Sequence, residues 1–231
     1  MMLAAIGMLI GHYAPALLLQ RARPSVPLPA LFVAAQLVDL AWALLVLMGV
    51  EHLRIVRGFS ASNDLELYDM PWTHSLASTP LWVLAAVVGW RAFRRGPAAT
   101  VDAAIVGLTV SSHFLLDFVV HVKDLPVAAA QGPKLGLGLW NAKAAAVLVE
   151  CGLFAFSALA WWWPRRAQPG AKKSAGLLAA MFAFAVASFF IPAPPTPAAM
   201  AASGLATWIV LPLLAAWATR ALRSESVVAL R

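Results

Sequence analysis

Seven apolar stretches, separated by short polar segments, run along the 231-residue chain. Each is close to the ~20 residues that a helix needs to cross the hydrocarbon core of a bilayer. They cover residues 2–20, 29–50, 74–90, 101–121, 142–163, 175–193 and 198–219. The pattern predicts an all-α, polytopic membrane helix bundle with about seven transmembrane helices.

Positive residues mark every second connection between these stretches. They are Arg21 and Arg23 after the first stretch, Arg91, Arg94 and Arg95 after the third, Arg165, Arg166, Lys172 and Lys173 after the fifth, and Arg220 and Arg223 after the seventh. Short loops rich in Lys and Arg stay in the cytoplasm. We therefore expect the N-terminus outside, the C-terminus in the cytoplasm, and the 51–73 and 122–141 loops outside.

Composition agrees with a membrane protein. Hydrophobic residues make up 62% of the chain, charged residues only 12%, and the mean hydropathy is +0.80. The +7 net charge lies in short loops, so we expect membrane lipids as partners and no nucleic acid. The chain reads as a single integral membrane domain, 1–231. Its last two stretches hold no acid, base or histidine in their cores, so residues 164–231 are expected to be scaffold and residues 1–163 to carry the chemistry.

Ionisable side chains interrupt the first four stretches. His113, Asp117 and His121 recur every fourth residue and so share one face of a helix. Burying such groups in hydrocarbon costs several kcal/mol each unless they face one another, water or a cation. Histidine and aspartate without nearby thiols suit zinc or another divalent transition metal. The pattern predicts a metal site, although a lone histidine can also simply hydrogen-bond a neighbouring carbonyl.

Depth along straight helices places His12 and Asp39 near the midplane and leaves His74 roughly 10 Å away from His12. Helix tilt, a loop dipping at Met70-Pro71-Trp72, or two separate metals could each account for that gap. Glu150 falls about 12 Å below the outer boundary, level with His113 and Asp117. We expect Glu150 to be a ligand, a general acid or base, or the partner of Lys143.

The loop at 51–73 is the one acidic connection in a basic protein. It is equally consistent with a lid over the site and with an ordinary solvated loop. Glu51 and His52 could bind metal, but residues just outside a span are more often solvated.

Four short motifs together resemble the YdjM-like family of inner-membrane metal-dependent hydrolases. They are Gly11-His12, Asp39, Thr73-His74-Ser75-Leu76, and Ser112-His113 with Asp117, within roughly the first 125 residues. The resemblance implies a relation to zinc-dependent phospholipases C and a place in the bacterial inner membrane. It also implies one to three divalent ions, with zinc favoured, held by His12, Asp39, His74, His113 and Asp117.

The expected activity is metal-assisted hydrolysis of a phosphoester in a lipidic or membrane-proximal substrate, at a site facing the extracytoplasmic side. Glu150 or His121 would transfer the proton. Trp140, Asn141 and Lys143, at the outer end of the fifth stretch, would bind the headgroup.

Two other classes remain open: a metal-ion or proton transporter or channel that uses the same His/Asp column, and a scaffold whose polar residues only tie helices together. A zinc amidase of the seven-span alkaline ceramidase type is disfavoured, because the last stretch carries no histidine.

Overall fold

The computed structural model describes residues 10–228 of the chain, and the side chains of residues 10–222. Eight α-helices build this part. They are α1 (Tyr13–Ala22), α2 (Leu28–Ala35), α3 (Leu37–Leu47), α4 (Thr79–Phe93), α5 (Pro97–Val120), α6 (Lys143–Trp162), α7 (Ala171–Ser188) and α8 (Pro197–Val228). Short 3-10 turns, η1 (Leu139–Asn141) and η2 (Trp163–Arg165), flank α6.

Four helices, α5 to α8, are long and apolar enough to cross a membrane. The pair α2 and α3 would make a fifth span, bent by 49° at the break between them. In contrast, α1 has 10 residues and α4 has 15, and residues 2–9 of the first expected span lie outside the described part. The described residues are compatible with an integral membrane helix bundle of four or five spans; the finer count of seven is not reproduced.

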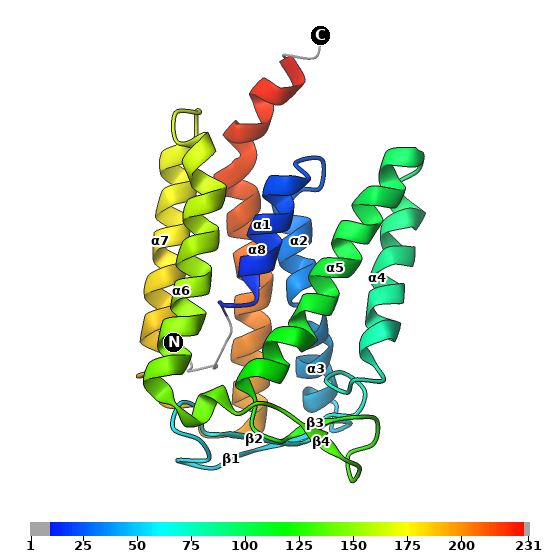
Figure 1. The fold of residues 1–231 in the computed structure, drawn as a ribbon, viewed down its shortest axis with the longest axis vertical. Coiled ribbons are helices and arrows are strands. Elements are labelled where there is room, and N and C mark those ends of the chain that lie inside the picture. Colours follow the sequence, from blue (N-terminus) through cyan, green and yellow to red (C-terminus); the bar gives the residue numbers. More distant parts are fainter. Residues whose placement is uncertain (1–9, 229–231) are drawn as a thin grey trace.

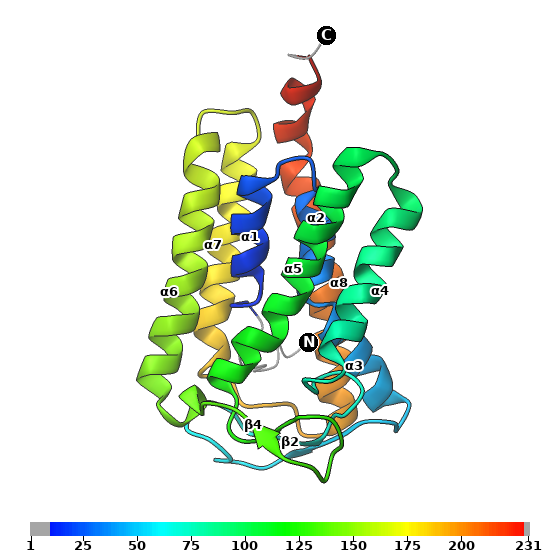
Figure 2. The ribbon, with the colours of Figure 1, turned by 45° about the vertical axis from the view of Figure 1, so that its right-hand side comes forward.

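The helices lie side by side with their connections at two opposite ends (Figure 1, Figure 2). One end, which we call the basic end, holds the α1–α2, α4–α5 and α6–α7 connections and the last turns of α8. These are the segments in which the positive residues were found in the sequence; the side chain of Arg223 lies outside the described side chains. The α3–α4, α5–α6 and α7–α8 connections form the other end, which we call the hairpin end.

Two small antiparallel β-hairpins cover the hairpin end (Figure 1). In the first, β1 (His52–Ile55) pairs with β2 (Leu65–Asp69); in the second, β3 (Leu125–Pro126) pairs with β4 (Lys134–Leu135). Leu53, Leu65 and Leu67 are buried, so the 51–73 segment packs against the bundle and is not merely a solvated loop.

Lys134 joins the two hairpins. Its Nζ donates a hydrogen bond to the Tyr68 carbonyl oxygen at 3.1 Å. Partial burial lowers the pKa of the Lys134 ammonium, while the carboxylates of Asp124 and Asp69 act in the opposite direction. The hairpins therefore support each other as one cover.

Gly136, next to β4, allows a close backbone approach that the cover needs. Its φ is +144°, and a Cβ added there would lie 1.9 Å from the Val122 carbonyl oxygen and 2.5 Å from that of His121. Because backbone atoms cannot yield as a flexible side chain can, we expect Gly136→Ala to destabilise the protein by about 2 kcal/mol or more. Thermal unfolding in detergent measures this effect.

The matched control for this substitution is Gly152→Ala on α6, where an added Cβ meets nothing within 4 Å. Alanine in a helix is favoured over glycine by up to about 1 kcal/mol, so this variant should unfold at the wild-type temperature or above it. Equal unfolding temperatures for Gly136→Ala and wild type would contradict the expectation.

Candidate metal centre

The centre begins on one buried face of α5. His113 and Asp117 lie one turn apart, and the Nε2 of His113 is 3.2 Å from an Asp117 carboxylate oxygen. His121 follows directly after the helix, and its Nε2 lies 3.6 Å from the other oxygen of Asp117. All three residues are buried. The fourfold spacing in the sequence therefore produces a column of donors inside the bundle, as expected for a helix.

Three further side chains reach this column from other segments. His12 precedes α1, and its Nε2 lies 3.0 Å from Asp117. Asp39 lies in the first turn of α3, with one carboxylate oxygen 3.2 Å from the Nε2 of His74 and 3.6 Å from that of His113. The Nε2 of His74 is also 3.7 Å from Asp117.

The structure thus brings all five expected ligands together. Two groups of three residues, each offering one donor atom within 4.8 Å of the others, could hold a metal ion: His12, His113 and Asp117, and Asp39, His74 and His113. Four segments distant in sequence converge here, and His113 belongs to both groups. That a metal binds them stays a prediction.

His74 reaches the centre because the chain dips. The sequence pattern started a helix at residue 74, but α4 begins only at Thr79, and residues 71–78 form turns. The Ser75 and Ser78 hydroxyls hold these turns by donating to the carbonyl oxygens of Pro71 and Thr73. This dip removes the depth mismatch that straight helices would impose.

In His74, His113 and His121, the Nδ1 nitrogen, which points away from the centre, is held by a hydrogen-bond acceptor. His113 Nδ1 lies 2.9 Å from the Ala35 carbonyl oxygen, which can only accept, so Nδ1 carries the proton. His121 Nδ1 lies 2.9 Å from an Asp124 carboxylate oxygen and donates in the same way. Protonation at Nδ1 leaves Nε2 as the nitrogen available for a ligand.

His74 is oriented through a relay. Thr73 Oγ1 donates its proton to Glu51 at 2.6 Å, so the same oxygen accepts from His74 Nδ1 at 2.8 Å. Glu51 is buried, and its other carboxylate oxygen accepts from the backbone N–H groups of Trp72 and Thr73. Histidine ligands of metals commonly have this arrangement, with the outer N–H held by a carboxylate, hydroxyl or carbonyl.

The break between α2 and α3 also helps to orient residues of the centre. Helix α2 ends at Ala35 and α3 begins at Leu37, with Gln36 at φ −111° and ψ 12° between them. The bend leaves the Ala35 carbonyl oxygen available to His113. It also places Asp39 in the first turn of a new helix, where a carboxylate is favoured by the helix dipole.

These contacts test whether a cation fits. The Nε2 atoms of His74, His113 and His121 face the carboxylates of Asp39 and Asp117 at 3.2 to 3.7 Å. An imidazole protonated only at Nδ1 would direct an Nε2 lone pair at these oxygens. Lone pair against carboxylate is repulsive unless a proton or a cation lies between them. His113 Nε2 is buried and makes no hydrogen bond with the described residues. The donor set, imidazole nitrogen and carboxylate oxygen, suits a divalent ion such as Zn²⁺.

The centre encloses a cavity of about 40 Å³, enough for a water molecule or an ion. Apolar side chains complete its wall beside the ligands: Trp42, Leu65, Leu67, Trp140 and Trp208. Because Leu65 and Leu67 come from β2, the first hairpin closes the cavity toward the hairpin end.

The other expected site residues are divided. Trp140 lines the cavity, and its ring centroid is 4.3 Å from that of His121. Glu150 is buried behind it and accepts from Trp140 Nε1 at 3.3 Å, so it stands one side chain away from the centre. Neither Asn141 nor Lys143 lines this cavity. Asn141 is exposed, and Lys143 borders a different cavity of about 280 Å³, with its Nζ over the Phe190 ring.

Sequence reasoning missed the residues that orient the ligands. Glu51 was expected to be solvated but is buried, and Asp124 was not singled out. His52, the neighbour of Glu51, is exposed and pairs with Asp69 at 2.8 Å. For Asp124, the available signal was an acidic residue three positions from a histidine of the expected site, His121.

Comparison with known proteins finds no family model, curated protein or solved structure that matches this chain.

Proposed function

We propose that this chain is an integral membrane, metal-dependent hydrolase that cleaves a phosphoester of a lipidic or membrane-proximal substrate. The observation that carries the proposal is the orientation of His74, His113 and His121. Their Nδ1 atoms are held by hydrogen-bond acceptors around the centre, and their Nε2 atoms face the carboxylates of Asp39 and Asp117. We also propose that the resemblance to the YdjM-like family reflects this shared chemistry.

A divalent ion bound here would polarise a phosphoryl oxygen and lower the pKa of bound water to about 7. His121 lines the cavity and is held by Asp124, so it is better placed than Glu150 to accept and return a proton. Glu150 would act through Trp140, by holding its ring against His121. The apolar wall would keep bulk water away.

A bacterial inner membrane location with the centre on the extracytoplasmic side belongs to the same proposal. The connections rich in Arg and Lys gather at the basic end (Figure 1). Such segments remain in the cytoplasm, which would turn the hairpin end and the metal centre outward.

A transporter using the same His/Asp column would need a polar route onward to the basic end. On α1 between His12 and Gln20, the buried side chains are instead Tyr13, Ala14, Ala16 and Leu17, and of these only Tyr13 carries a polar atom. This filling supports a closed pocket. Metal-ion or proton flux in liposomes that is lost in Asp39→Asn would favour the transporter.

The direct test compares two histidine variants. Purified wild type should hold zinc, and should hydrolyse a phosphodiester such as bis(p-nitrophenyl) phosphate or a lipid from a phospholipid panel. His113→Ala should lower zinc affinity by more than about 100-fold. The matched control is His52→Ala, which removes an exposed histidine and should bind zinc and hydrolyse as wild type does. Equal metal content in both variants, or hydrolysis that survives full chelation, would refute the proposal.

A further inference from the structure

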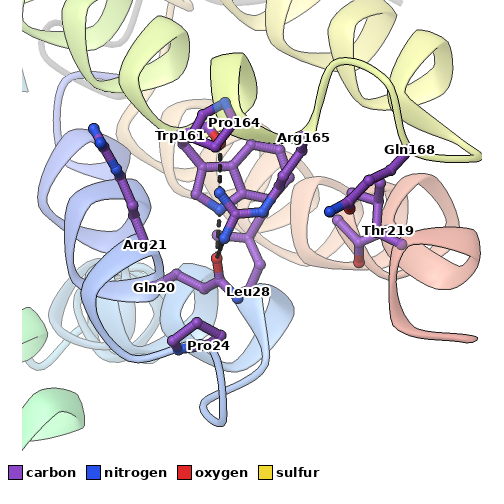
Figure 3. Close-up of a pocket in the computed structure, with 10 residues that line it drawn as sticks. Gln20, Arg21, Pro24, Leu28, Trp161, Pro164, Arg165, Gln168 and Thr219 are labelled. Atoms are coloured by element: carbon purple, nitrogen blue, oxygen red, sulfur yellow. Dashed lines mark hydrogen bonds between the residues drawn. The ribbon is translucent and has the colours of Figure 1, made fainter. Parts of the chain in front are cut away.

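Another cavity lies at the basic end of the bundle. Its volume is about 490 Å³, and it is lined by side chains from α1, the end of α6, η2 and α8 (Figure 3). Its polar lining residues are Gln20, Arg21, Arg165, Gln168 and Thr219. No carboxylate lines it.

Arg165 is held rigidly at this cavity. Its Nη2 donates to Gln20 Oε1 at 3.1 Å, its Nη1 donates to the Trp161 carbonyl oxygen, and its guanidinium lies 4.6 Å from the Trp161 ring centroid. In Figure 3 the Arg165 side chain reaches from the α6 end to Gln20. A guanidinium has five N–H donors, so some remain for a ligand, already oriented.

The charge at this cavity is unbalanced. Within residues 10–222, no carboxylate lies within ion-pair distance of Arg21 or Arg165, whereas neighbouring Arg23 pairs with Asp102 at 2.7 Å. Arg21 and Arg165 both line the cavity. Two arginines that line a cavity with no carboxylate among its lining residues favour an anion, and phosphate matches the hydrogen-bonding geometry of a guanidinium group.

An apolar hollow adjoins the cavity and shares Arg21 and Pro164 with it. Its volume is about 380 Å³, and its remaining lining comes from α6 and η2: Phe156, Leu159, Ala160 and Trp163. Phe156 is 65% exposed and Leu159 61%, as expected of a helix face turned toward lipid. Arg21 thus stands between a polar cavity and a hydrocarbon-facing hollow.

We propose that this pair of cavities binds an anionic phospholipid from the leaflet at the basic end, with the phosphate on Arg21 and Arg165 and an acyl chain along the α6 hollow. A free phosphate would use the polar cavity alone. The adjoining apolar hollow favours a lipid over free phosphate, because only the lipid has an acyl chain to fill it. The site is independent of the metal centre and of the proposed hydrolysis.

Native mass spectrometry of the detergent-purified full chain tests this, with dioleoyl phosphatidylglycerol, dioleoyl phosphatidylcholine and inorganic phosphate as probes. Wild type should retain phosphatidylglycerol well above phosphatidylcholine. The double variant Arg21→Gln/Arg165→Gln should bind phosphatidylglycerol about 30-fold more weakly, as expected for the loss of two charges at a membrane surface. Arg95→Gln, which removes an exposed charge from the same end, should bind as wild type does.

Two further variants separate the sources and the sites. Ala160→Trp fills the hollow and should weaken lipid binding without changing any binding of inorganic phosphate. Asp117→Asn should bind lipid as wild type does, because the metal centre is not involved. Arg165→Lys retains the charge and shows whether loss of binding follows from misfolding. The proposal is overturned if the double variant binds phosphatidylglycerol as wild type does, or if inorganic phosphate binds as well as the lipid.

Discussion

Replacing Asp117 with Asn should abolish metal binding and hydrolysis while leaving the helical bundle in place. One oxygen of Asp117 lies 3.0 Å from His12 Nε2 and the other 3.2 Å from His113 Nε2. The amide has nearly the same shape but no charge, and one of its two terminal atoms becomes a donor. We expect zinc affinity to fall by more than about 100-fold and hydrolysis to fall below detection. Metal analysis after dialysis against buffered zinc measures the first effect.

Asp69→Asn is the matched control for Asp117→Asn. Asp69 belongs to β2 and pairs with exposed His52 rather than with the centre. Its loss should leave zinc content and hydrolysis at wild-type values. Circular dichroism and gel filtration of both variants would separate loss of metal from loss of fold. Full zinc occupancy in Asp117→Asn would show that the centre is not a metal site.

Replacing Glu51 with Ala should both destabilise the protein and weaken metal binding. The carboxylate of Glu51 accepts from two backbone N–H groups and from the Thr73 hydroxyl. Each buried donor left without an acceptor costs about 1–3 kcal/mol, so we expect a total loss of about 3 kcal/mol or more. Because Thr73 orients His74, zinc affinity should also fall by about 10- to 100-fold. Unfolding in detergent and zinc titration measure the two effects.

The control for Glu51→Ala lies on β2 of the first hairpin. Glu66 pairs with Arg54 at 3.3 Å on the surface, and such pairs contribute about 0–1 kcal/mol. Glu66→Ala should therefore change neither quantity by much. If Glu51→Ala lowers stability but binds zinc as wild type does, the relay through Thr73 plays no part in orienting His74.

The sequence was most informative where one element carried the whole pattern. His113 and Asp117 lie on α5 and His121 caps its end, so the period of the helix alone fixes their common face. The basic connections were similarly readable, because they alternate along the chain. Each feature depends on local geometry, and each reappears in the structure as an inner face of α5 and as the basic end.

Features that depend on distant partners could not be read in this way. The strands of the first hairpin have four and five residues and those of the second two each, too few to stand out beside long apolar stretches. Burial of Glu51 follows from the donors that the dipping turn presents, and no local signal encodes that turn. The break at Gln36 involves no glycine or proline at the bend itself, so hydropathy alone joined α2 and α3 into one straight span.

Because of that break, the second span must keep the helical register of its residues, and not only its hydrophobicity. Each residue added to or removed from a helix rotates the later residues of that helix by about 100°. A single-residue insertion between Ala35 and Asp39 would swing the Asp39 carboxylate away from His74 and His113, although the segment would enter the bilayer as readily as before. Membrane insertion therefore depends on the hydrophobicity of this segment, whereas assembly of the centre depends on its register, and the same insertion can leave the first intact while it disrupts the second.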